Sequence, residues 1–401
     1  MSFDIPGTTL FDAAQARKGY ALNKMCYSFN DAANRKAFAA DEEGYCTKYA
    51  LNAQQREAIR ERNVLKLIAA GGNVYYLAKF AGIFGLDVQD IGAQQTGMSK
   101  DAFKAMLVEQ GKQKQENKEQ HTMANIVGAI TTSHVPAIGR AIAKNLQSDP
   151  YWKPFFDGWP PVHRWLENVK PDVAVVFYND HGLNFFLDKM PTFAVGAAPE
   201  YRSTDEGWGI PQVPPFQGEQ DLSWHLIESL VGDEFDVVSC QEMVVDHAIT
   251  LPMALMYPSQ AWPLKIVPVC INTVQFPLPS AKRCYALGEA VGRAVRAWKS
   301  DARVVVLGTG GLSHQLDGER AGFINKDFDL AFMESLLHDP RWATQFDSRQ
   351  LVEKAGTQGI ELLMWLAARA ALGERVSAVH RNYHIPISNT ASGLMVMTPA
   401  A

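Results

Sequence analysis

This 401-residue chain has few cysteines, and none of them stands in a CxxC pair. The five are odd in number and scattered along the chain: Cys26, Cys46, Cys240, Cys270 and Cys284. Neither a disulfide framework nor a thiolate zinc site is favoured by this pattern. Free cysteines of this kind fit a reducing compartment, so we expect a cytoplasmic protein.

Long apolar runs and an excess of positive charge are also missing. No stretch of 18 apolar residues occurs, and the N-terminus has no apolar core of the signal-peptide type. The formal net charge is -5, which gives no general attraction to nucleic acid or to anionic membranes. We therefore expect neither as a partner, and an anionic substrate would need local positive charge such as a metal ion.

The first part of the chain has the pattern of an all-helical domain, residues 1–110. Apolar residues lie along one side of Gln54–Ala69, which we predict as a single helix ending at a Gly-Gly pair, and Asn73–Phe84 is a second candidate. The polar segment 111–122 follows, and we interpret it as a linker. Directly after it, Met123 resembles the natural start of a second polypeptide, so the chain has the organisation of two fused subunits.

The pattern from residue 123 to 401 changes to strands alternating with helices. This alternation predicts an α/β domain with a central, largely parallel or mixed sheet flanked by helices. We expect strands at 127–131, 173–177, 235–239, 265–269 and 304–307, and helices at 281–299 and 359–371.

Three of the predicted buried strands are followed closely by a histidine. These are His134 after NIVGAITT, His181 after VAVVFY and His314 after RVVVLGT. The carboxyl ends of parallel strands share one edge of a sheet, where ligand sites form. One such histidine could be structural, because a single backbone hydrogen bond satisfies a neutral imidazole. Three at one edge are better explained as a catalytic or metal site.

A carboxylate that could complete such a site is Glu361, in the otherwise apolar segment GIELLMWL. A buried carboxylate must be paired or coordinate a metal; here Arg369 is the alternative partner. Two histidines and one carboxylate are the ligands of non-haem Fe(II) oxygenases, and they also suit catalytic zinc, so a zinc-dependent hydrolase stays open. The glycine-rich turn 308–311 matches no phosphate-binding pattern, and we interpret it as a tight turn that orients His314.

Specific motifs carry a family resemblance. In chain order, ITTSHVPAIG, VVFYNDHG, VDHAITLPM, GTGGLSHQLDGERAGFINKDFD, GIELLMWL and YHIPISNTASG resemble the type II (LigB-like) extradiol ring-cleaving dioxygenases, in particular the catalytic β subunit of protocatechuate 4,5-dioxygenase. The N-terminal motifs DIPGTTLFDAAQARKGYALN, ADEEGY, GGNVYYLAK and TGMSKDAF are similar to the small helical α subunit of the same enzymes.

The resemblance implies a role for each of five residues. His134, His181 and Glu361 would hold Fe(II). His314 falls on the family's acid–base histidine, and His247, in VDHA, on a second active-site histidine.

The resemblance also implies the substrate class and the assembly. Ser388 and Asn389 would meet the carboxylate end of a carboxylated catechol, which is opened by O₂ next to its diol. Protocatechuate, giving 4-carboxy-2-hydroxymuconate semialdehyde, is the first expectation; gallate or 3-O-methylgallate is the second. Val88 falls about where one familiar member places an aromatic residue at the pocket mouth. The paired subunits of the relatives imply a homodimer of the fused chain.

Overall fold

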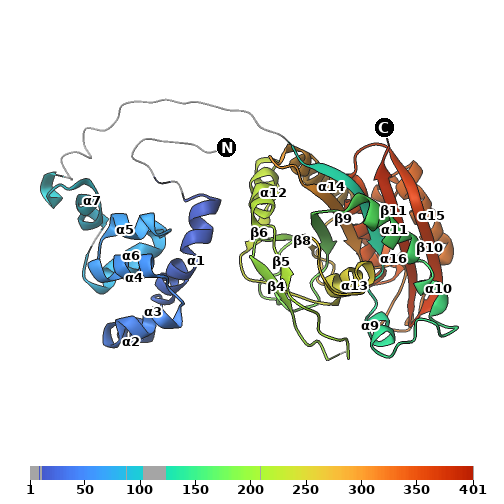
Figure 1. Cartoon of the computed structure of the whole chain (residues 1–401), viewed down its shortest axis with the longest axis horizontal. Helices are drawn as coiled ribbons and strands as arrows, with labels where there is room; N and C mark the ends of the chain where they lie inside the picture. The colour runs from blue at the N-terminus through green and yellow to red at the C-terminus, as the bar shows by residue number, and fades with distance from the viewer. Residues whose placement is uncertain (1–8, 10, 87, 103–122, 208, 401) are drawn as a thin grey trace. The chain divides into compact units, whose positions relative to one another are not determined.

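The computed structural model describes residues 9, 11–86, 88–102, 123–207 and 209–400. It divides into two compact units, residues 1–120 and 121–401, which are shown in Figure 1. Within these described ranges, no helix combines the length and the apolar character needed to cross a membrane.

The described part of the first unit is helical, as predicted. Its helices are α1 (Ala13–Ser28), α2 (Ala32–Ala40), α3 (Glu42–Lys48), α4 (Ala53–Glu61), α5 (Val64–Ala69), α6 (Val74–Ile83) and α7 (Val88–Thr96). The predicted linker 111–122 lies outside the described residues. So does the side chain of Val88, although its backbone begins α7.

The single helix predicted over 54–69 is wrong, because two helices occupy this stretch. Arg62, after α4, adopts the left-handed conformation with φ +53°, which a continuing helix cannot accommodate. The side chain of Asn63 then accepts a hydrogen bond from the backbone of Lys66 and caps α5. The second predicted helix is confirmed as α6, with Asn73 as its N-cap.

The second unit is built on an eight-stranded sheet with strand order β10-β11-β1-β9-β2-β8-β3-β6. The strands are β1 (Asn125–Thr132), β2 (Val173–Tyr178), β3 (Phe193–Gly196), β6 (Val237–Cys240), β8 (Lys265–Ile271), β9 (Arg303–Thr309), β10 (Val376–Ile387) and β11 (Thr390–Pro399). A smaller sheet joins β4 (Glu200–Ser203), β5 (Phe216–Gln217) and β7 (Val244–Val245).

The centre of the large sheet is parallel and its flanks are mixed. Strands β1, β9, β2 and β8 are parallel neighbours, whereas β11 and β3 each run antiparallel to the central strand beside them. Strand β2 lies between β9 and β8 and is buried along its whole length, which explains its uninterrupted apolar sequence. The predicted α/β class with a largely parallel or mixed sheet is confirmed.

Helices cover both faces of this sheet. Because side chains alternate along a strand, Val175 and Phe177 of β2 pack on one face and Val176 and Tyr178 on the other. The first face is covered by α12 (Gln220–Gly232), α14 (Ala281–Ala297), α15 (Lys326–His338), α16 (Ser348–Ala355) and α17 (Leu362–Ala371). The second is covered by α9 (Pro136–Ala143), α10 (Lys153–Phe156), α11 (Pro160–Val169) and α13 (His247–Met256). Two short 3₁₀ turns, η1 (Trp342–Gln345) and η2 (Gly359–Glu361), complete the unit.

The antiparallel hairpin of β10 and β11 was not predicted from the sequence. One helix was expected over 359–371, where η2 precedes α17. Most side chains of β10 are partly or fully exposed, so its sequence lacks the apolar run by which the central strands were found.

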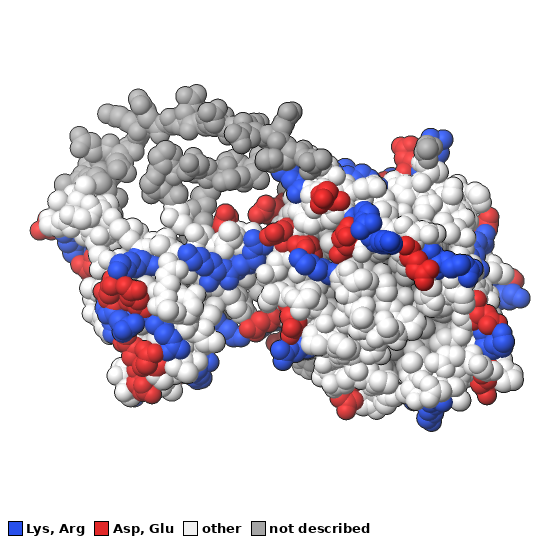
Figure 2. All heavy atoms as spheres, in the orientation of Figure 1, with Lys and Arg blue, Asp and Glu red and all other residues white. Residues whose placement is uncertain are grey.

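On the face of this unit seen in Figure 2, basic and acidic side chains are interspersed.

Candidate active site

Three neighbouring parallel strands place the predicted histidines at one edge of the sheet. His134 follows β1, His181 follows β2 and His314 follows β9, and β9 lies between the other two strands. All three side chains line one cavity of about 600 Å³. The predicted convergence is therefore present in the structure.

Glu361 lies directly against two of these histidines. One carboxylate oxygen is 3.4 Å from Nε2 of His134, and the other is 3.7 Å from Nε2 of His181. Only 7 % of the Glu361 side chain is exposed. Burial alone would raise the pKa of this carboxyl, yet the neighbouring imidazoles, His134 foremost, hold it well below its ordinary value.

The alternative pairing of Glu361 with Arg369 is not observed. The guanidinium of Arg369 instead donates to the backbone carbonyls of Leu336, Gly373 and Glu374. Arg369 therefore satisfies carbonyl groups near the end of α17, and Glu361 is left to interact with the histidines.

Hydrogen bonds fix which ring nitrogen of His134 faces the site. The hydroxyl of Thr309 donates to the carbonyl of Phe177, so its oxygen is left to accept from Nδ1 of His134, 3.2 Å away. Nε2 of His134 then faces Glu361, 3.4 Å from its carboxylate, and is the nitrogen that would bind a metal.

A buried carboxylate orients His181 in the same way. Oδ2 of Asp246 accepts from both the backbone N–H of His181, at 2.8 Å, and from Nδ1, at 2.9 Å. Burial alone would lower the pKa of His181, but Asp246 and Glu361 outweigh it and raise this pKa to about 10. The two carboxylates thus make the site favourable for positive charge, which a metal cation would supply.

His247 is the third imidazole of the cluster. Its ring centroid lies 4.0 Å from that of His181 and 5.3 Å from that of His134. Glu206 accepts from its backbone N–H at 2.8 Å and from Nδ1 at 2.6 Å, so Nε2 is left as the free nitrogen. Burial and the neighbouring His181 lower the pKa of His247, which keeps the ring neutral.

His314 lies in the same cavity and is tied to the backbone rather than to a carboxylate. Its Nδ1 donates to the carbonyl of Leu312 at 2.8 Å. A carbonyl can only accept, so the neutral ring carries its free lone pair on Nε2. A lone pair held in this way can accept a proton from a bound ligand.

The glycine-rich turn after β9 packs closely against Glu361. Gly310 has φ +108°, and a Cβ on it would lie 2.7 Å from Cβ of Glu361. The backbone N–H of Gly311 donates to Glu361 at 2.8 Å. The turn therefore both leads to His314, as expected, and leaves space for the carboxylate, which the sequence analysis did not foresee.

The donor set fits a divalent cation. Ligand nitrogens of His134, His181 and His247 lie within 4.8 Å of one another, and Glu361 adds a carboxylate beside the first two. The Asn179 amide nitrogen is 3.2 Å from both His181 Nε2 and Glu361 Oε1, so these two ligand atoms face the same point. Imidazole and carboxylate ligands of this kind suit iron and zinc alike.

The two predicted substrate-binding residues differ in position. Ser388 lines the cavity, whereas Asn389 is exposed and is not part of the described wall. Both lie in the turn between β10 and β11. Their predicted role in binding a substrate carboxylate remains a prediction.

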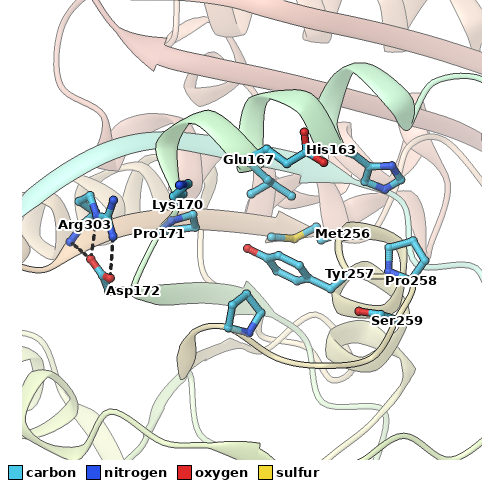
Figure 3. A pocket seen from close by; sticks show the side chains of 12 residues that line it. His163, Glu167, Lys170, Pro171, Asp172, Met256, Tyr257, Pro258, Ser259 and Arg303 are labelled. Atoms are coloured by element: carbon cyan, nitrogen blue, oxygen red, sulfur yellow. Dashed lines mark hydrogen bonds and ion pairs between the residues drawn. The ribbon is translucent and has the colours of Figure 1, made fainter.

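A second hollow, of about 520 Å³, is bordered by the start of β2 and by α11. Arg303 and Asp172 form the two-point ion pair drawn in Figure 3, and His163 hydrogen-bonds to the carbonyl of Leu255. It contains none of the predicted site residues.

Four supporting residues were missed by the sequence analysis: Asn179, Glu206, Asp246 and Thr309. Asp246 had a signal, since an acidic residue directly precedes His247 just as Asp180 precedes His181. Glu206 had none, because it lies in an irregular loop far from His247 in the chain.

Comparison with known proteins identifies relatives for both units. The family model described as the catalytic LigB subunit of aromatic ring-opening dioxygenase matches residues 128–393. The LigA subunit of the aromatic-ring-opening dioxygenase LigAB matches residues 22–108.

Individual relatives agree with the family models. A gallate dioxygenase of Pseudomonas putida is 37 % identical over 45 % of this chain and 54 % of its own length, so the match spans about half of that relative. Two 2,3-dihydroxyphenylpropionate/2,3-dihydroxicinnamic acid 1,2-dioxygenases are also similar. That of Photorhabdus laumondii is 27 % identical over 68 % of this chain and 96 % of its own. That of Xanthobacter autotrophicus is 29 % identical over 58 % and 87 %.

Proposed function

This chain belongs to the LigB family of aromatic ring-opening dioxygenases, an extradiol ring-cleaving class, and on this premise we propose that it uses Fe(II) and O₂ to open a carboxylated catechol. The observation that carries the proposal is the position of Glu361 between His134 and His181. Two neutral imidazoles and one carboxylate leave a bound Fe(II) with a net positive charge. That charge favours a catecholate ligand.

When bound by His134, His181 and Glu361, Fe(II) would supply the Lewis acidity and one-electron chemistry that let a singlet diol react with triplet O₂. The protein supplies position and proton transfer. Nε2 of His314 takes a phenolic proton of the diol, and the same nitrogen later returns that proton to an oxygen of the substrate as the ring opens. The neutral ring of His247, fixed by Glu206, offers a further polar contact at the reacting end of the substrate.

The names of the relatives support an aromatic diol that carries a carboxylate. Gallate and 2,3-dihydroxyphenylpropionate both have adjacent ring hydroxyls and a carboxylate group. A cavity of about 600 Å³ is of the size that holds one substituted ring. We propose protocatechuate as the substrate, with gallate or 3-O-methylgallate as the alternative.

A direct test begins with anaerobic purification and loading with Fe(II). Protocatechuate should then cause O₂ uptake in equimolar amount with the appearance of a yellow ring-fission product, and gallate serves as the competing substrate. A matched sample loaded with Zn²⁺ is the control. Hydrolase activity that is present with zinc while ring cleavage is absent with iron would overturn the proposal.

The organisation of the chain is part of the same proposal. We infer a LigA-like domain over residues 1–110, a linker over 111–122 and a LigB-like catalytic domain over 123–401. We also infer that the fused chain forms a homodimer in the cytoplasm.

A further inference from the structure

We propose that Arg140 selects substrates with a carboxylate by forming an ion pair with that group at the mouth of the cavity. This inference rests on the proposed function and extends it, because it assigns the recognition of substrate charge to one side chain. Without such a side chain, the described walls of the cavity would discriminate poorly between an acid and its neutral ester.

The position of Arg140 follows from that of His134. Helix α9 (Pro136–Ala143) begins directly after this histidine. Pro136, Ala137 and Arg140 stand three and four residues apart, so they share one face of the helix, and all three line the cavity. Arg140 therefore lies one helical turn beyond Pro136, the residue at which α9 begins just after His134.

The guanidinium of Arg140 is available for a ligand. No ion pair or hydrogen bond joins it to any other side chain or backbone group that the structure describes. Its alkyl stem passes Gly209, since a Cβ built on Gly209 would lie 3.9 Å from Cδ of Arg140. Gly209 belongs to the same loop as Glu206, which orients His247.

The charges around the cavity fix which end of the substrate meets Arg140. Among the described residues of its wall, Arg140 is the only lysine or arginine. Asp317 is an exposed acid of the wall and accepts a hydrogen bond from Thr357 at 2.5 Å, so it stays anionic. A carboxylate is repelled from Asp317 and from Glu361 and is attracted to Arg140, while the diol end is left for the metal.

The expected size of the effect is moderate. A guanidinium can bind a carboxylate through two parallel hydrogen bonds, which are stronger than neutral ones. Arg140 is exposed, so water and salt screen the pair. We expect a preference for the acid of about tenfold.

The test compares protocatechuate (3,4-dihydroxybenzoate) with its methyl ester, which keeps the diol but has no carboxylate charge. Dissociation constants are measured anaerobically on the full-length, Fe(II)-loaded protein by calorimetry, and kcat/KM is measured with O₂. The variants are Arg140→Met, which removes the charge at similar length, and Arg140→Lys, which keeps it. Lys144→Met is the matched control, because Lys144 ends the same helix but is not among the described residues of the cavity wall.

Arg140→Met should weaken binding of the acid about tenfold and leave the ester unchanged, while Arg140→Lys restores part of the preference. Lys144→Met should behave as wild type. Equal weakening of acid and ester, or no change in either, would overturn the inference. A wild-type protein that cleaves the ester as well as the acid would remove this inference alone, whereas one that cleaves neither would remove the proposed function as well.

Discussion

Oδ2 of Asp246 accepts two hydrogen bonds from a single residue, His181: one from its backbone N–H and one from Nδ1. Burial alone would raise the pKa of Asp246, but His181 and, more weakly, His247 hold it at about 2. The carboxylate is therefore ionised at every pH at which the protein would act, and it directs Nε2 of His181 toward Glu361.

Asp246→Asn should weaken Fe(II) binding by about 10- to 100-fold, because the amide keeps the shape but not the charge that orients the imidazole. Asparagine can still cap α13, so the fold is preserved. Competition with a chelator measures the affinity. The control is Asp172→Asn, which removes a surface ion pair with Arg303; equal affinities in the two variants would contradict the assignment of His181 as a ligand.

His314→Phe should lower kcat by at least about 100-fold with one Fe(II) still bound. Phenylalanine fills the space of the imidazole but has no nitrogen to accept the phenolic proton. Metal content by elemental analysis and kcat by O₂ uptake give the two readouts. Loss of iron from this variant would show that His314 is a ligand rather than the acid–base group.

The role of His247 separates two possible ligand sets. If His134, His181 and Glu361 hold the metal, His247→Phe should retain iron and lower kcat by about 10- to 100-fold. Glu206→Gln should produce a smaller loss of the same kind, because the amide can still orient the ring. If His247 is a fourth ligand, as the cluster of three imidazoles would also allow, the iron content of His247→Phe falls instead.

The sequence could predict the edge of the sheet at which the site forms, because strands β1, β2 and β9 are buried and apolar and each is followed by a histidine. It could also predict Glu361, since a carboxylate in an apolar segment requires a partner. These signals are local. Asp246 and Glu206 could not be assigned as partners of His181 and His247, because those contacts depend on how distant loops fold over the sheet edge.

The glycine-rich turn could also be predicted only in part from the sequence. Its sequence indicated a tight turn after β9, and the structure has one. That a segment fifty residues further on would bring Glu361 against Gly310 depends on how α17 packs on the sheet, which no local pattern encodes.

Gly310→Ala should displace Glu361 and reduce both stability and iron content. The added Cβ would lie 2.9 Å from a carboxylate oxygen of Glu361, at φ +108°. Gly322→Ala is the matched control: Gly322 has φ +85°, and a Cβ there meets nothing within 4 Å. The free energy of unfolding of the control should fall by about 1 kcal/mol from backbone strain alone. That of Gly310→Ala should fall by about 1–3 kcal/mol more. Equal losses, with iron retained in both, would contradict the packing argument.

Asp329 gives the second unit a stability that depends on pH. Its carboxylate accepts from the backbone N–H and hydroxyl of Ser313 and from the hydroxyl of Tyr383. Burial outweighs these bonds and raises the pKa of Asp329 from 3.8 to about 6. The folded protein therefore binds this proton more tightly than the unfolded chain does.

The sign of the effect follows from linkage. The contribution of Asp329 to stability is fully present below its unfolded pKa of 3.8 and is lost as the pH rises through about 6. The loss amounts to roughly 3 kcal/mol. Asp329→Asn cannot titrate, so the variant should lack this fall between pH 4 and pH 7.

Urea unfolding followed by tryptophan fluorescence provides the measurement, because all nine tryptophans lie in the second unit. The difference in unfolding free energy between wild type and Asp329→Asn should change by roughly 3 kcal/mol over this pH range. Asp327→Asn, on the same helix, is the control for a general change of charge, because Asp327 is exposed. If wild type and Asp329→Asn keep a constant difference from pH 4 to pH 7, the carboxyl of Asp329 is ionised throughout, and the three donors outweigh its burial.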